Sequence, residues 1–396
     1  MPRFSIVVPT RDRPDLLDFC LAGIAAQTFD DIEVIVSDNA VERPARETFE
    51  RWKRAGWRYL RPEEPVAMHE NFELATGAAT GDYVAIVIDK TILHPSALAV
   101  VTRCVEQIGD VDIVTWRNEG YNPANERAAL GRGYFAAAAV TAAPAQYDPM
   151  DDLRARFAMA ERRGTDEIQY VRGKIVFGAY SRRLLDRMRA QTGRLFHPLA
   201  PDYTSLVPAS VLADRALDVG RPLLVSYNST RSNGRRQGID PVHARRFIEA
   251  VDPAIIDALP IRGLYTSAHN VVAYDLVSSA ARCPAGATPA LDEPNLLRRA
   301  REDLAGVDWV DESERAGQYA ILEEAERRAG LAPAADEPHP RSTPRRLAGE
   351  LVTRVPALER LYLRAAGRTE AVPQRYGSPV EAARAADRVY ATRSGG

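Results

Sequence analysis

The fold is decided by residues 4–39, FSIVVPTRDRPDLLDFCLAGIAAQTFDDIEVIVSDN. The runs FSIVVP and IEVIVSDN at its two ends are rich in β-branched residues and predict strands. Between them, Leu17, Leu21 and Ile24 recur at helical spacing, which predicts an amphipathic helix. A strand, a helix and a strand within about 35 residues predict a right-handed βαβ unit with parallel strands.

The start of this helix carries signals of its own. Asp12 is a candidate N-cap, and Pro14 suits the first helical turn. The alternation then continues with predicted helices at 45–56, 68–80 and 94–109 and predicted strands at 57–61, 83–88 and 111–116. We therefore expect an α/β fold with a mainly parallel sheet flanked by helices.

The later chain has a different pattern. From about residue 120 strands and helices are mixed, and beyond 240 the apolar spacing is mostly helical. Residues 331–345 contain four prolines, which is typical of a linker. We predict four parts: an α/β domain at 1–240, a helical region at 241–330, the linker at 331–345, and an amphipathic helix with a flexible tail at 346–396.

Composition excludes several classes of protein. The 396 residues are 45% hydrophobic and 27% charged, with a formal net charge of −2, which argues against binding nucleic acid. The three cysteines share no metal-type spacing and indicate reduced thiols in a cytoplasmic protein. No run approaches the ~20 apolar residues of a membrane span.

Polar residues follow three of the predicted strands, at the point where each strand ends. They are Thr10 and Arg11, Asp38 and Asn39, and Asp89. Ligands bind at the carboxyl edge of open α/β sheets, so these positions predict a nucleotide pocket. The first strand is followed by neither the G-x-G-x-x-G pattern nor a P-loop, which removes the main support for a dinucleotide fold and excludes a P-loop NTPase.

The motifs resemble those of family 2 glycosyltransferases with the GT-A fold. Pro9-Thr10, Gln27-Thr28-Phe29 and Ser37-Asp38-Asn39 match the opening of that family in order and spacing, and ENFELATGAATGDYVAIVIDKT (70–91) is similar to its next block through Asn71 and Asp89. The later stretch FHPLAPDYTS (196–205) resembles a bacterial subgroup. The resemblance covers residues 3–100 closely and fades after about 236.

The resemblance implies a role for each matched residue. Thr10 and Asp38 would contact the base and the ribose of a nucleotide sugar, with Pro9, Arg11, Asn39 and Asn71 completing the pocket. Asp89 would be the first acid of the metal-binding element, and Asp202 would be the general base near the acceptor. In an inverting transfer such a base removes the proton of the attacking hydroxyl.

One element departs from the family pattern. Where an acidic triplet is expected, the sequence has Asp89-Lys90-Thr91, which makes a divalent metal cofactor doubtful. Three explanations are open: Mg²⁺ or Mn²⁺ held through Asp89 alone, a diphosphate neutralised by Lys90 with Arg231, Arg235 and Arg236 of a basic loop, or a degenerate and inactive site. If Asp89 faces the pocket, alternation along a strand would turn Lys90 away from it.

The sequence thus predicts an inverting glycosyltransferase of the hexosyltransferase type. Its donor would be a UDP- or dTDP-sugar, and its acceptor a hydroxyl of a polysaccharide, a lipid-linked glycan or a secondary metabolite. The alternative is a catalytically inactive, nucleotide- or glycan-binding partner protein. A basic amphipathic helix within 345–368 is a candidate for peripheral contact with the inner face of the membrane or for a homodimer interface.

Overall fold

The computed structural model describes residues 3–123, 133–135, 137, 142–160, 168–228, 236–331 and 374–393. The chain forms two compact units. The first comprises Met1–Ser229, Asp275–Ala290 and Arg375–Gly396, and the second comprises Thr230–Tyr274 and Leu291–Gln374. This division differs from the predicted boundary at residue 240, because two later segments pack on the first unit. Apolar spacing predicts a helix but does not reveal which unit the helix packs against.

A mixed sheet runs through the first unit in the order β11-β7-β6-β9-β4-β1-β2-β3, with β10 pairing β5, β6 and β8. The strands are β1 Phe4–Thr10, β2 Ile32–Asp38, β3 Trp57–Leu60, β4 Tyr83–Ile86, β5 Thr91–Leu93, β6 Ile113–Pro123, β7 Gly133–Phe135, β8 Ala145–Tyr147, β9 Gly178–Ser181, β10 Ala216–Tyr227 and β11 Gln374–Tyr376. Strands β4, β1, β2 and β3 are parallel neighbours, as the βαβ pattern predicts. Strand β9 is antiparallel to both β4 and β6.

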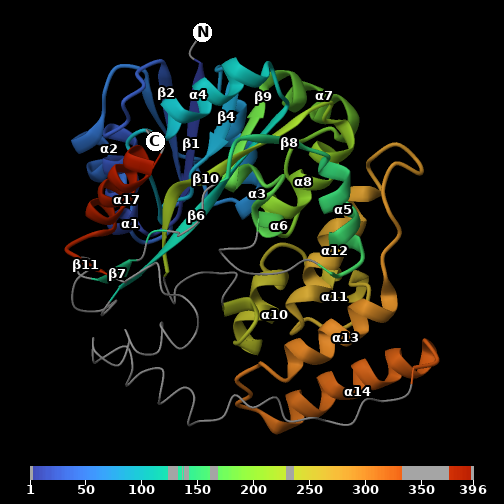
Figure 1. Ribbon diagram of the computed structural model, residues 1–396. Helices are drawn as coiled ribbons and strands as arrows, with labels where there is room; N and C mark the ends of the chain where they lie inside the picture. The colour runs from blue at the N-terminus through green and yellow to red at the C-terminus, as the bar shows by residue number, and fades with distance from the viewer. Residues whose placement is uncertain are drawn as a thin grey trace. The chain divides into compact units, whose positions relative to one another are not determined.

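Helices cover this sheet (Figure 1). They are α1 Pro14–Ala25, α2 Arg46–Trp52, α3 Met68–Gly77, α4 Ala97–Ile108, α5 Pro149–Phe157, α6 Ile168–Val171, α7 Arg182–Thr192 and α8 Pro201–Leu212, with a 3₁₀ turn, η1, at Ile175–Phe177. The predicted mainly parallel α/β architecture is confirmed for its central strands. The predicted strand at 83–88 is shorter, because β4 ends at Ile86 and the chain turns at Asp89 and Lys90 into β5.

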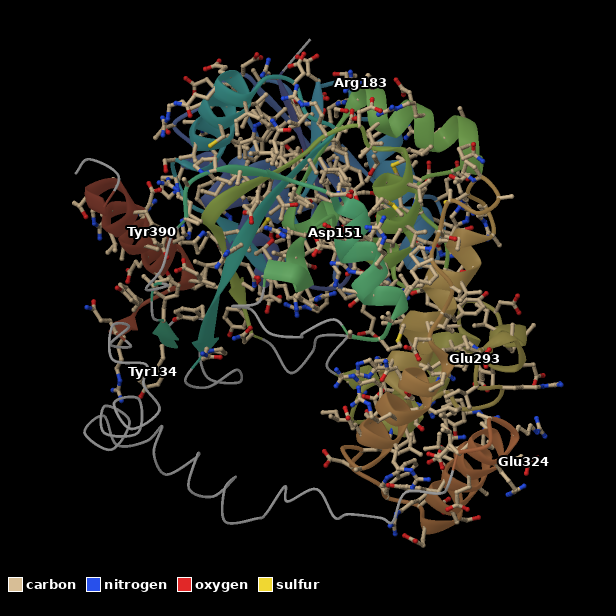
Figure 2. All side chains as sticks on the ribbon, turned by 45° about the vertical axis from the view of Figure 1, so that its right-hand side comes forward. Tyr134, Asp151, Arg183, Glu293, Glu324 and Tyr390 are labelled. Atoms are coloured by element: carbon tan, nitrogen blue, oxygen red, sulfur yellow. The ribbon has the colours of Figure 1, made fainter. Side chains whose placement is uncertain are left out.

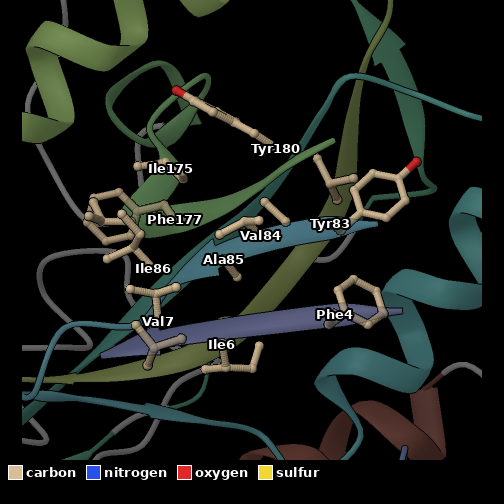
Figure 3. Packing of buried hydrophobic residues seen from close by; sticks show 14 of the residues in the cluster. Phe4, Ile6, Val7, Tyr83, Val84, Ala85, Ile86, Ile175, Phe177 and Tyr180 are labelled. Atoms are coloured by element: carbon tan, nitrogen blue, oxygen red, sulfur yellow. The ribbon is translucent and has the colours of Figure 1, made fainter. Parts of the chain in front are cut away.

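The core lies between the sheet and its helices. Every residue of β1 and β4 is buried, which explains why both read as continuous apolar runs rather than alternating ones. Figure 3 shows Ile6 and Val7 of β1 beside Val84 and Ile86 of β4. Full burial of one such aliphatic side chain contributes about 1.5–3 kcal/mol to folding. This packing fixes the strand tips that carry the polar residues.

The C-terminal segment completes the first unit. Strand β11 joins the edge of the sheet, and helix α17 (Pro379–Arg393) contributes Ala382, Ala386 and Tyr390 to an apolar cluster with residues of α1, β5 and β10 (Figures 1 and 2). The Tyr390 hydroxyl donates a hydrogen bond to buried Glu119. The flexible tail predicted within 346–396 is therefore a folded element over 374–393. The predicted linker and amphipathic helix lie outside the described residues, except for Leu331.

The second unit is helical where it is described, as predicted for the region after 240. It contains α10 Pro241–Glu249, α11 Ala254–Ala258, the first part of α12 (Ala268–Ala280), α13 Glu293–Leu304 and α14 Glu312–Arg328. Buried Leu304 and Leu322 join α13 to α14, and Arg301 donates to Glu326 across the same pair. Within the described ranges of both units, no helix has the length and apolarity needed to cross a bilayer.

Candidate functional site

The site is built on the carboxyl end of β1. Parallel pairing places Thr10 opposite Asp38, and the neighbouring β4 leads into the turn that carries Asp89. The Thr10 hydroxyl donates a 2.9 Å hydrogen bond to Oδ2 of Asp89. The same oxygen lies 3.3 Å from Nε of Arg13, the residue that precedes α1. The structure thus brings the predicted Thr10 and Asp89 together and adds Arg13, which the sequence analysis missed.

Asp89 is almost fully enclosed, with 2% of its surface exposed. Burial raises the pKa of its carboxyl group, while the charge of Arg13 and the hydrogen bond from Thr10 oppose that rise. A buried carboxylate is stable only with such partners. The Asp89 carboxylate is therefore already bonded to Thr10 and Arg13 of the protein itself.

Lys90 follows Asp89 in the turn, not in a strand. Burial lowers the pKa of the Lys90 amine, as does neighbouring Arg13, while Asp89 and Asp202 favour its charged form. Both carboxylates therefore influence the charge of Lys90, and strand alternation does not decide which way its side chain points. The rule of alternation does not apply because the turn breaks the strand before Asp89.

Asp38 is also fully buried. Its carboxylate accepts hydrogen bonds from the backbone N–H groups of Ala40 (3.1 Å) and Ala45 (2.7 Å) and from the Tyr59 hydroxyl (2.5 Å). Burial, together with the adjacent Asp38, raises the pKa of Tyr59 to about 12. These bonds hold the chain that follows β2. A contact between Asp38 and a base remains a prediction.

The other predicted pocket residues also support this loop. Asn39 donates to the carbonyl of Val66 and accepts from its N–H, at 2.8 and 2.9 Å. Asn71 accepts a 2.7 Å hydrogen bond from Ser37, and Pro9 is buried within β1. These contacts shape the edge of the sheet, and direct contact of these residues with a nucleotide remains a prediction.

Asp12 ties the loop after β1 to the loop after β2. One oxygen of its carboxylate accepts hydrogen bonds from the N–H groups of Val41, Glu42 and Arg43, at 2.8–3.0 Å. The prediction that Asp12 caps α1 is wrong, because Arg13 occupies the N-cap position and Asp12 adopts a left-handed φ of 56°. Arg11 is exposed and lies 3.9 Å from Asp12.

Asp202 lies in the first turn of α8 and has one buried cation beside it. Nζ of Lys174 is 3.6 Å from its Oδ2, with 0% of the Lys174 side chain and 25% of the Asp202 side chain exposed. The Lys174 ammonium also lies 3.8 Å from the ring centroids of Tyr170 and Tyr203, which is cation–π geometry. The carboxylate is therefore the open member of this pair.

Asp275 on α12 binds the backbone just before α8, the helix whose first turn carries Asp202. Its carboxylate accepts hydrogen bonds from the N–H groups of Leu199 (2.5 Å) and Ala200 (2.9 Å), and Ala200 is the N-cap of α8. Burial raises the pKa of Asp275 to about 8, and nearby Asp202 adds to that rise. Asp275 thus fixes the backbone that presents Asp202.

The residues present do not fit a divalent metal built on the predicted triplet. Asp89 is paired with Arg13, and Lys90 adds a second positive charge. The Thr91 hydroxyl donates to the carbonyl of Ile88, and Thr91 is fully buried at the start of β5. Among the described residues, no group of three or more histidine, cysteine or acidic side chains is arranged to hold a metal ion. Mg²⁺ favours carboxylate oxygens free of such competition.

The predicted basic loop is described only in part. Arg231 and Arg235 lie outside the described residues. Arg236 is described, and its guanidinium pairs with Asp240 at 3.0 Å. A phosphate contact by Arg231 or Arg235 therefore remains a prediction.

The family comparison identifies the segment that contains the strand tips. Residues 5–172 match the family described as Glycosyl transferase family 2. The matched segment is similar to the proteins of that glycosyltransferase family. This match confirms the predicted enzyme class and includes Thr10, Asp38 and Asp89, but it ends before Asp202.

Some solved structures align with the chain at low sequence identity. TarS of S. aureus is 13% identical with a TM-score of 0.44; the alignment covers 82% of this chain and only 53% of that one. Residues 1–349 of TarS in complex with UDP-GlcNAc give 13% identity and a TM-score of 0.46. That alignment covers 84% of this chain and 94% of the TarS chain. The mannosyltransferase PcManGT from Pyrobaculum calidifontis, in complex with GDP-Man and Mn²⁺, is 18% identical with a TM-score of 0.38. The alignment covers 83% of this chain and 87% of that one. No curated protein matches the chain.

Proposed function

We propose that the protein is an inverting glycosyltransferase that moves a hexose from a UDP- or dTDP-sugar to an acceptor hydroxyl. The observation that carries this proposal is the cluster at the tips of β1 and β4, where Asp89 contacts Thr10 and Arg13; the charge of Lys90 beside it is influenced by both Asp89 and Asp202. An open carboxylate next to a cationic strand tip supplies what such a transfer needs: a base and an anion-binding end. The family match over residues 5–172 supports sugar transfer in general.

In the proposed reaction the acceptor oxygen attacks the anomeric carbon of the donor sugar. The bond from that carbon to the phosphate oxygen breaks, and the nucleoside diphosphate leaves with the electron pair. Asp202 takes the proton of the acceptor hydroxyl, which is the role of a general base. Attack and departure on opposite faces of the sugar invert the anomeric configuration.

Negative charge grows on the leaving diphosphate and must be offset in the transition state. Arg13 and Lys90 supply positive charge on the side of Asp89. Lys174 lies on the side of Asp202 and is fully buried, so it acts on that carboxylate and not on the leaving group.

The proposal is tested with the full chain and a panel of UDP-, dTDP- and GDP-sugars. We expect at least one nucleoside diphosphate to raise the melting temperature by mass action. We also expect the corresponding sugar donor to release that diphosphate, slowly to water and faster once an acceptor sugar is added. Acceptors to add are free sugars, lipid-linked glycans and aglycones with free hydroxyl groups.

The alternative, a catalytically inactive partner protein, draws support from Lys90 and Thr91 in place of acids. Binding without any release of diphosphate, over the whole donor and acceptor panel, would favour it. If no nucleoside diphosphate binds at all, neither an active glycosyltransferase nor an inactive nucleotide-binding protein is supported. Peripheral membrane contact or dimerisation through 345–368 is tested separately, by vesicle sedimentation and by light scattering.

A further inference from the structure

The environment of Asp89 differs from that of a metal ligand. Its Oδ2 accepts from Thr10 and pairs with Arg13, and the residue is buried. A dication that bound this oxygen would have to displace a guanidinium from a position 3.3 Å away. Separating this pair would leave Arg13 without its partner, which disfavours a metal at Asp89.

Arg13 is itself open on its outer side. Its side chain is 23% exposed, while that of Asp89 is 3% exposed. Its Nε lies 3.5 Å from the carbonyl of Arg11. Among the described residues, none accepts a hydrogen bond from its two terminal nitrogens. A planar guanidinium with free N–H groups can donate two parallel hydrogen bonds to a phosphate.

Lys90 adds a second cation, in the turn that carries Asp89. Its carbonyl accepts a 2.8 Å hydrogen bond from the N–H of Tyr227, which fixes the turn against β10. Its amine lies in the field of both Arg13 and Asp202. Arg13 and Lys90 thus bring two positive charges to this strand tip, and both can attract a diphosphate.

We propose that Arg13 and Lys90 bind the diphosphate of the donor directly and take the place of a divalent metal. This inference rests on the proposed function, because it concerns the donor end of the same site. Arg13 supplies the bidentate guanidinium, and Lys90 supplies a point charge. Asp89 orients Arg13 and is not a metal ligand. The donor site is thus metal-independent.

The test measures binding by the full chain after treatment with EDTA. The probes are UDP and inorganic pyrophosphate, each with and without MnCl₂, followed by thermal shift and titration calorimetry. We expect both probes to bind in EDTA, with less than about a twofold change when Mn²⁺ is added. Arg13→Met and Lys90→Met should each weaken binding at least tenfold, which corresponds to one lost charge-assisted contact of about 1.4 kcal/mol.

Two further variants keep the test independent of folding defects. Asp89→Asn removes the negative charge beside Arg13, and we expect it to tighten UDP binding in EDTA; a metal ligand replaced in this way would instead lose Mn²⁺-dependent binding. Arg51→Ala removes an exposed arginine paired with Asp18 on the surface and serves as the matched control. Circular dichroism confirms that each variant is folded.

The outcomes separate the two proposals. Binding that appears only with Mn²⁺, or that survives both Arg13→Met and Lys90→Met, overturns the metal-independent site. If the donor is still turned over in that case, the proposed function stands. If neither probe binds under any condition and no donor is turned over, the proposed function itself fails.

Discussion

Asp89 and Asp202 are each paired with one cation, and the two pairs are arranged in opposite ways. At Asp89 the carboxylate is enclosed and Arg13 is 23% exposed; at Asp202 the carboxylate is 25% exposed and Lys174 is enclosed. The exposed member decides what each pair offers to a substrate. One end of the site therefore presents positive charge to a phosphate, and the other presents a base to a hydroxyl.

The largest expected effect concerns the open carboxylate. Asp202→Asn should lower kcat for donor turnover by about 10²–10⁴-fold, because general-base catalysis contributes that much. UDP binding should change little, since the carboxylate acts on the acceptor side. Steady-state kinetics and calorimetry measure the two quantities. Asp151→Asn, on the exposed side chain that pairs with Arg154, is the matched control and should behave as the wild type.

If Asp202→Asn keeps more than a tenth of the wild-type kcat, the assignment of the base is wrong. The contrast between the two pairs would then lose its functional meaning, although the geometry would remain.

The enclosed carboxylate should matter to stability. Asp89→Ala removes the partner of Arg13 and the acceptor of the Thr10 hydrogen bond. We expect the free energy of unfolding to fall by about 2 kcal/mol, less than for a fully buried pair because Arg13 remains partly hydrated. Urea denaturation measures this loss. Glu50→Ala, which breaks exposed pairs with Arg46 and Lys53, should cost less than about 1 kcal/mol.

Equal costs for Asp89→Ala and Glu50→Ala would show that the Asp89 pair is not enclosed in solution. The description of Arg13 as its outward-facing member would then fail.

Lys174 allows function to be separated from stability. Removing one partner of a fully buried pair is destabilising, but the Asp202 side chain is 25% exposed and stays hydrated without Lys174, while the cost of burying the ammonium disappears. Lys174→Met should therefore unfold at the wild-type temperature or above it. Its kcat should nevertheless fall about tenfold, with the donor KM unchanged, because the Lys174 ammonium, 3.6 Å from Oδ2 of Asp202, helps to position that carboxylate. A melting temperature that falls together with kcat would indicate a structural role alone.

A further expected effect is a pH dependence of stability. The pKa of Asp275 is about 8 in the folded protein and about 3.8 without burial, so the folded state binds a proton that the unfolded state releases over that range. Stability should therefore be highest below about pH 4 for this group and should fall as pH rises towards 8. Melting temperatures at pH 5, 6.5 and 8 measure the slope.

Asp275→Asn removes this titration and should flatten the slope. An unchanged slope in the variant would mean that another group causes it.

The parallel strands and their polar tips were predictable from residues 4–39 and 83–89. Local periodicity determines them, because β-branched runs and helical spacing act over a few residues. Thr10 and Asp89 were predicted together for the same reason: both follow buried strands.

Arg13, Lys174 and Asp275 were not predicted. Each acts on a residue far away in the chain, so no local spacing reveals the partner. One signal was nevertheless present. Asp275 is the one acidic residue of α12, and Leu276 and Val277 follow it directly. A single charge within a buried segment indicates a specific partner.

Helix α17 has a consequence for the order of events during protein synthesis. The apolar cluster that it covers is formed by α1, β5, β6 and β10, which all leave the ribosome before the second unit is made. At about 5–20 residues per second, that patch waits on the order of 10 s for its cover. The nascent first unit is thus incomplete while the second one is translated, and a chaperone that recognises exposed apolar surface has that interval in which to bind.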